Sequence, residues 1–341
     1  MAKRPAQRRL FRELAAKFGL EVANAYLSVV RDLTSQIELQ KLILAIERRD
    51  LQAAMDALHL TRSAFQPVDT KLSEAFVAGG QGAVASMPAA ISIGFRFDPG
   101  NQRAAEIIRA RAGRLITGLL ETELQAAREH LADGMARGLH PNAVALDLVG
   151  RVNRVTRVRE GGLIGLSRPQ RDYLASARLE LASADPALLN NYLARKQRDK
   201  NFDAAVRRAI RTGKPMDAGT AKTAATHYSN RMLRLRGQTI ARTEALPTIR
   251  AAKREAYQQL VDDGRVATQD IVRGWVVTKD GRQRDSHDAM GGQEVRGLDQ
   301  PFASPSGAQF MFPGDTSLGA PANEVIDCRC DEYIAIRKWP I

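Results

Sequence analysis

The sequence is poor in several features that define common protein classes. Its 341 residues include two cysteines, too few for the disulfide framework of a small secreted scaffold. Aromatic residues make up 5%, which is low for a large β-sandwich. The longest apolar run, Ala83 to Phe95, has about 13 residues and contains Pro88, whereas a bilayer span needs about 20. The glycines of Gly79-Gly80-Gln81-Gly82 lack the Lys-Ser/Thr pair of a phosphate-binding P-loop. We therefore expect a soluble protein of a reducing compartment.

What is present favours a mainly helical protein. Hydrophobic residues make up 44% and charged residues 26%, enough to bury a core, and the length suits roughly two domains. We predict an N-terminal helical region over residues 1–150 and a basic helical region with one long helix over 151–264. Residues 265–341 are predicted to form a small α+β domain with a few short strands.

Capping signals and apolar periodicity place the helix boundaries. We expect Ser35 and Glu38 to form a capping box, Asp50 to cap a helix over 51–58, and the 79–82 glycines to interrupt a helix. Further helix starts are expected at Asp98-Pro99, Pro141 or Asn142, Ser167-Arg168-Pro169, Asp185-Pro186 and Asn201 or Asp203. The long helix is predicted over 217–262, kinked or broken by Pro247 near Glu244.

The amino-acid composition changes after Gly264. Stretches of β-branched and aromatic residues there alternate with loops rich in Gly, Pro, Asp and Ser. Short strands are predicted at 271–278, 309–312 and 328–336.

The basic surplus gathers in one stretch. Residues 195–254 contain sixteen basic and four acidic residues, a net charge of +12 within a chain total of +13. This density favours sequence-independent contact with DNA phosphates over an ordinary solvated helix face, with acidic protein surfaces as a second target. The residues predicted to bind DNA or a partner are Arg207, Arg208, Arg211, Arg231, Arg234, Arg236 and Arg242.

Chemistry-bearing side chains are densest in the C-terminal region. His287, Cys328 and Cys330 are normal zinc ligand types, and Asp285 could complete a set of four. Residues two apart on a strand are separated by about 7 Å, too far for one ion without a bend. A competing interpretation is that the two thiols pack as small hydrophobes while His287 bonds locally. We expect no cofactor, and zinc only as a structural ion.

Two enzymatic alternatives use the same region. One is a metal-dependent nuclease or hydrolase built on His287, Asp285 and the Cys328/Cys330 pair. The other is an acid/base site of Asp280, Asp285, Asp288 and His287. Solvated acidic loops with one histidine are common, so we expect no enzyme.

An ordered set of motifs resembles one protein family. Thr239-Ile240-Ala241-Arg242-Thr243-Glu244-Ala245 is similar to the IARTE signature of the Mu F-like phage head morphogenesis proteins. It is followed by Trp275, the Asp280–His287 block, Phe312-Pro313-Gly314-Asp315 and the closing segment Asn323–Cys330. The motif residues are Arg242, Thr243, Glu244, Arg284, His287, Cys328, Arg329 and Cys330. Asp327 stands where the family usually has Asn.

The resemblance covers residues 239–333, with weaker likeness around Phe97-Asp98-Pro99 and residues 201–210. It implies a minor head protein of a tailed phage that joins the prohead in few copies, associates with the portal vertex and capsid or scaffold proteins, and affects DNA packaging. The implied location is the virion head, and the host cytoplasm during assembly. A toxin-like effector is a third interpretation, since some Mu F-like modules are fused to such domains, but we predict no segment for one beyond residue 333.

Overall fold

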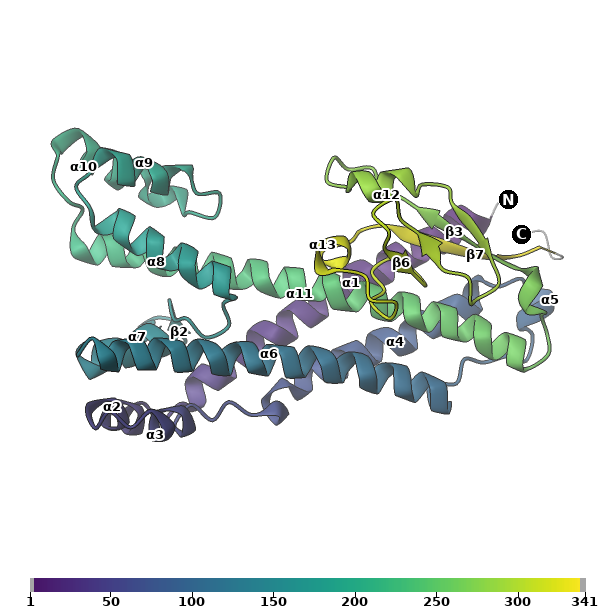
Figure 1. Ribbon diagram of the computed structural model, residues 1–341, viewed down its shortest axis with the longest axis horizontal. Helices are drawn as coiled ribbons and strands as arrows, with labels where there is room; N and C mark the ends of the chain where they lie inside the picture. Colours follow the sequence, from purple (N-terminus) through teal and green to yellow (C-terminus); the bar gives the residue numbers. More distant parts are fainter. Residues whose placement is uncertain (1–2, 338–341) are drawn as a thin grey trace. The chain divides into compact units, whose positions relative to one another are not determined.

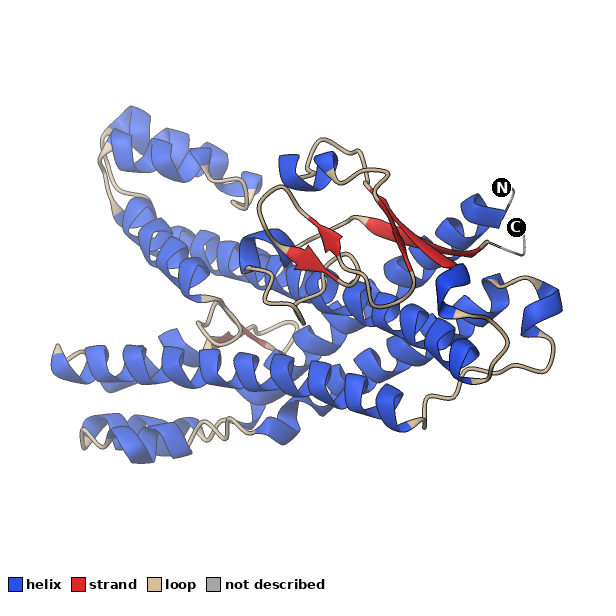
Figure 2. Cartoon of the chain, turned by 45° about the vertical axis from the view of Figure 1, so that its right-hand side comes forward, coloured by secondary structure: helices blue, strands red, loops and turns tan. Residues whose placement is uncertain are grey.

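The computed structural model describes residues 3–337 of the chain. These residues are mostly helical, with a few short antiparallel strands near the C-terminus, which confirms the predicted fold class (Figure 2). None of the helices within this range is long and apolar enough to cross a bilayer.

The chain divides into two compact units, each assembled from segments far apart in the sequence. Unit 1 contains residues 1–25, 67–115 and 238–341, and unit 2 contains residues 26–66 and 116–237. Three long helices contribute residues to both units: α1 (Lys3–Gln36), α6 (Gln102–Ala136) and α11 (Ala218–Asp262).

Unit 1 contains a three-stranded antiparallel sheet beside the second half of α11 (Figure 1). The strand order is β4 (Glu294–Arg296), β3 (Ile271–Val276) and β7 (Asp331–Ile336), and β3 pairs with β7 along its whole length. A separate hairpin joins β5 (Phe302–Ala303) to β6 (Gln309–Phe310). The remaining elements are α4 (Gln66–Ser86), α5 (Ala89–Ser92), the 3-10 turn η3 (Thr268–Asp270), α12 (Asp285–Ala289) and α13 (Ala322–Val325).

The outer edge of β7 is closed by side chains from two helices. The buried Gln7 amide of α1 accepts a hydrogen bond from Ile334 N at 3.3 Å and donates to Ile334 O at 3.5 Å. The Tyr257 hydroxyl of α11 donates to the same carbonyl at 3.3 Å. Because these groups occupy backbone positions that an edge strand leaves open, β7 needs no further strand beside it.

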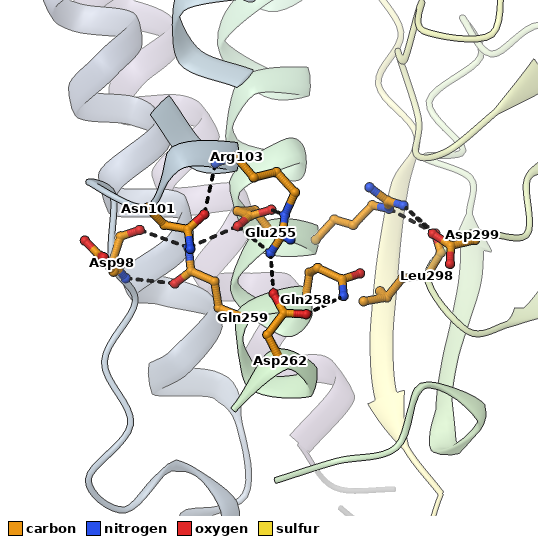
Figure 3. Close-up of polar contacts among 10 residues, drawn as sticks. Asp98, Asn101, Arg103, Glu255, Gln258, Gln259, Asp262, Leu298 and Asp299 are labelled. Atoms are coloured by element: carbon orange, nitrogen blue, oxygen red, sulfur yellow. Dashed lines mark hydrogen bonds and ion pairs between the residues drawn. The ribbon is translucent and has the colours of Figure 1, made fainter. Parts of the chain in front are cut away.

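Polar contacts tie α6 to α11 within unit 1 (Figure 3). Both nitrogens of the Arg103 fork reach Glu255, at 2.7 and 3.0 Å, and Nη2 also reaches Asp262 at 2.7 Å. The Gln259 amide pairs with the backbone of Asp98, accepting from its N–H and donating to its C=O. Bidentate arginine–carboxylate geometry of this kind fixes orientation as well as proximity.

Unit 2 is built from short helices around the rest of the long ones. Its elements are α2 (Leu39–Glu47), α3 (Leu51–Asp56), η1 (Arg62–Phe65), α7 (Pro141–Val149), β1 (Arg151–Val152), β2 (Arg159–Glu160), α8 (Arg168–Ala182), α9 (Pro186–Ala194), η2 (Lys200–Phe202) and α10 (Asp203–Thr212). Several predicted caps are confirmed. Asp50 accepts from Ala53 N, Ser167 forms a capping box with Gln170, and Asp185 accepts from Ala187 N.

Two local predictions are wrong, and of the kink or break predicted at Pro247 the break is absent. Ser35 lies inside α1, and Glu38 is the N-cap of α2 without a side-chain bond. The 79–82 glycines do not interrupt α4. They allow close packing instead, because a Cβ on Gly80 would lie 2.2 Å from the Phe97 ring. Pro247 does not break α11, which continues through it, and Gly314 packs directly on the Pro247 ring.

Two glycines of α6 in unit 2 offer a matched test of packing. A Cβ on Gly134 would lie 2.7 Å from both methyl carbons of the buried Val144, whereas a Cβ on Gly118 would meet nothing within 4 Å. We expect Gly134→Ala to lower the free energy of unfolding by about 1–3 kcal/mol. Gly118→Ala should raise it by about 0.5–1 kcal/mol through helix propensity. Urea denaturation of both variants checks this, and a stabilising Gly134→Ala would contradict the described α6–α7 packing.

Candidate functional site

The two cysteines lie in a bend rather than on a strand. The predicted strand over 328–336 begins only at Asp331, so Cys328 and Cys330 belong to the loop that leaves α13. Asp327 at the start of this loop has a φ of 57°, a left-handed conformation that turns the chain. The bend removes the separation that a strand would impose, and the thiols converge.

His287 completes a compact group with the two thiols. Its Nδ1 lies 3.6 Å from Cys328 Sγ and 3.5 Å from Cys330 Sγ. Within residues 3–337, these three residues form the group of potential metal ligands whose atoms all lie within 4.8 Å of one another. The other ring nitrogen, Nε2, lies 2.9 Å from Glu324 Oε2, which also accepts a hydrogen bond from the Ser286 hydroxyl at 3.0 Å.

The group is enclosed by an apolar core. His287, Cys328 and Cys330 are 1%, 2% and 3% exposed, respectively. The rings of Trp275 and Phe310 lie edge-on to the imidazole, with centroids 5.4 and 5.8 Å away. Around the cysteines pack Trp275, Met290, Phe302, Phe310 and Val325.

The two thiols shift each other's pKa in opposite directions. The pKa of Cys328 is lowered well below its usual value, chiefly because the Cys330 thiol donates a hydrogen bond to it and secondarily because of His287. The pKa of Cys330 is raised, chiefly by its hydrogen bond to Cys328 and secondarily by burial.

Two cationic side chains of α11 donate hydrogen bonds to backbone carbonyls at and near the cysteine loop. The buried Arg250 donates from Nη1 to Pro313 O at 2.8 Å and from Nη2 to Cys330 O. Lys253, which is 1% exposed, donates to Glu332 O at 2.6 Å, and burial lowers its pKa. These basic residues are therefore structural parts of the module.

The motif residues of α11 contact the same loop. Arg242 pairs with Asp327 at 3.0 Å, and Thr243 Oγ1 accepts from Asp327 N at 3.2 Å. Burial raises the pKa of Glu244, against the opposing charges of Arg111 and Arg114.

Two further motif arginines fix the loop from the other side. Arg284 donates to the carbonyls of Asn323 and Ile326, both at 2.5 Å. Arg329 pairs with Asp280 at 2.5 Å. Together with the α11 contacts, these bonds hold both ends of the segment that carries Glu324, Cys328 and Cys330.

Three of the four predicted metal ligands come together. Asp285 is exposed at the start of α12 and is outside the group. The carboxylate that reaches His287 belongs to Glu324, which our ligand set left out although it lies in the closing motif segment, four residues before Cys328.

The carboxylates of the acid/base alternative are dispersed. Asp280 pairs with Arg329, Asp288 lies 3.9 Å from Lys279, and both Asp285 and Asp288 are exposed. They do not share a site with the buried His287, so the geometry offers no specific support for hydrolysis.

The predicted DNA-binding arginines fall into two groups. Arg207, Arg208 and Arg211 on α10 and Arg234 on α11 are exposed, and no ion pair within 4.0 Å engages them in the described part of the chain. The other three have protein partners. Arg231 pairs with Asp199 at 3.2 Å, Arg236 is 8% exposed beside Glu123, and Arg242 pairs with Asp327.

The sequence analysis did not single out Arg273, a buried cation on the central strand β3. Arg273 of β3 is fully buried and donates to the carbonyls of Gly297, at 2.9 Å, and of Gln300 and Met311. The sequence does contain a sign of this role, because Arg273 lies inside the apolar run Ile271–Val276. A charged side chain in a buried strand must have buried hydrogen-bond partners.

Comparison with known proteins supports the resemblance. Residues 200–332 match the family model described as Phage Mu protein F like protein, which confirms the Mu F-like resemblance for that part of the chain. No curated protein and no solved structure matches the chain.

The role of Arg250 is testable through stability. Arg250→Ala leaves two buried carbonyls without their donors, and we expect the free energy of unfolding to fall by about 2–5 kcal/mol. Arg234→Ala removes an exposed arginine from the same helix and should change it by less than about 0.5 kcal/mol. Chemical denaturation of both variants gives the comparison. Equal effects would show that Arg250 does not support the loop.

Proposed function

From the match of residues 200–332 to the Phage Mu protein F like family, we propose that the chain is a minor head protein of a tailed phage that acts in head morphogenesis. The family match is the observation that carries this proposal. The contacts of the motif residues support it, since Arg242, Thr243 and Arg284 all hold the segment that closes the family motif.

We propose that the protein works by binding and not by catalysis. The histidine and cysteines are enclosed in the core, while the nearby aspartates are dispersed or paired with cations. A reaction would need a nucleophile or base open to substrate, and this arrangement supports folding instead. The partners proposed are the portal protein and capsid or scaffold proteins, reached through helical surface.

We further propose that one exposed surface of unit 2 contacts packaged DNA. This basic α10 surface comprises Lys196, Lys200, Arg207, Arg208, Arg211 and Lys214, all of which are exposed. The two acidic residues within 196–214 are paired internally. Asp199 bonds His227 at 2.7 Å, and Asp203 pairs with Arg198 at 2.9 Å. Little negative charge therefore opposes the surface, which suits it to phosphate.

The assembly role predicts where the protein is found. Calibrated mass spectrometry of purified virions and proheads should detect it in few copies relative to the major capsid protein. Proheads assembled without portal protein should have lost it, because we place its docking site at the portal vertex. Absence from both virions and proheads would overturn the proposed function.

The DNA contact predicts a change in salt dependence. The affinity for duplex DNA falls as salt rises, so log affinity has a negative slope against log salt. Replacing Arg207, Arg208 and Arg211 with Gln should make this slope less steep by about three, since each phosphate contact contributes about 0.9. Filter binding across a salt series measures this slope.

A matched control removes the same net charge elsewhere. The exposed Lys279, Arg282 and Arg296 of the C-terminal module, replaced together with Gln, should leave the slope unchanged. If both triple variants shift the slope equally, binding follows net charge alone and the α10 surface is not the contact.

A further inference from the structure

We propose that His287 Nδ1, Cys328 Sγ and Cys330 Sγ bind a zinc ion, with Glu324 orienting the histidine. This inference is independent of the proposed head assembly role, because it rests on the geometry of one buried group of side chains. The ion would lie inside the C-terminal module and act structurally.

The distances agree with a tetrahedral ion. Zinc–sulfur bonds of about 2.3 Å and zinc–nitrogen bonds of about 2.0 Å, at tetrahedral angles, place sulfur and nitrogen ligands about 3.5 Å apart. The observed Nδ1–Sγ distances are 3.6 and 3.5 Å. Both nitrogen–sulfur pairs thus already have the spacing that a shared ion requires, and all three atoms lie within 4.8 Å of one another.

The surroundings of His287 are those of a metal-bound imidazole. Such a histidine commonly has a carboxylate against its second ring nitrogen, which holds the proton there and leaves the first nitrogen's lone pair for the metal. Glu324 Oε2 lies 2.9 Å from Nε2, and the Ser286 hydroxyl donates to the same oxygen. With the proton held on Nε2 in this way, the lone pair of Nδ1 would face the two sulfurs.

The donor set and the burial select the ion and its role. Two thiolates and one imidazole suit zinc better than the oxygen-seeking magnesium or calcium. Three protein ligands leave the fourth position to a water molecule. Since no ligand residue is more than 3% exposed, the ion would serve to tie the loop of Cys328 and Cys330 to α12.

Metal analysis of the full-length protein tests the proposal directly. After purification with zinc present, elemental analysis should find about one zinc ion per chain. Replacement by cobalt should give a thiolate-to-cobalt charge-transfer band together with the strong visible bands of tetrahedral cobalt. Substoichiometric zinc, or bound cobalt without the thiolate band, would overturn the proposal.

Variants of α12, α13 and the loop after α13 locate the site. His287→Ala and Cys328→Ser should lose stoichiometric metal, whereas Asp285→Ala, two residues from His287 on the same helix but exposed, should retain it. Glu324→Gln should still bind zinc, with affinity reduced about 10- to 100-fold. Full metal content in His287→Ala would exclude this ligand set.

A measurement on the unmodified chain covers the case in which a variant fails to fold. Removal of zinc by a chelator should lower the thermal unfolding midpoint, and added zinc should restore it, because the ion binds only the folded loop. A midpoint that responds to neither treatment would refute a structural ion.

Discussion

Buried cations bonded to backbone carbonyls are the interaction on which the C-terminal module depends. The module has three short strands in its main sheet and a two-residue hairpin, so much of its backbone lies in loops without ladder partners. Arg273 alone bonds three loop carbonyls, and Arg250 and Lys253 of α11 bond two more segments. Hydrogen bonds to charged groups contribute about 1.5–3 kcal/mol each, which is more than the neutral bonds of such short strands.

These bonds also determine where the two cysteines lie. Arg250 holds the carbonyl of Cys330, while Arg242 and Thr243 hold Asp327 at the turn just before Cys328. Because both ends of the three-residue bend are fixed, the thiols point to the same side and meet His287. The helix signature and the closing motif are thus two halves of one structural unit, although about eighty residues separate them in the sequence.

Local sequence signals predicted the local structure well. Asp50, Ser167 and Asp185 cap helices as their spacing indicated, and the apolar run at 271–276 forms the central strand. Errors arose where distant residues decide the outcome. The 79–82 glycines and Pro247 read as helix breakers, but each packs against a segment that no local window contains. Each of the two units is built from segments far apart in the sequence, which no local pattern reveals. The contact between Glu324 and His287 likewise arises only when the folded chain brings α12 and α13 together.

The clustering of basic residues illustrates why composition cannot assign a binding surface by itself. Residues 195–254 have one charge density along the sequence, yet the structure gives their cations two different environments. Toward the end of α11, Arg250 and Lys253 are buried and already bonded, so their desolvation is offset by carbonyls and none of their charge is available to a ligand. On α10 the arginines face solvent, and their hydration and counterions can be exchanged for phosphate. Only cations in the second environment can contribute to DNA affinity, and the proposed contact is placed at residues 196–214 because six exposed cations lie close together in that stretch.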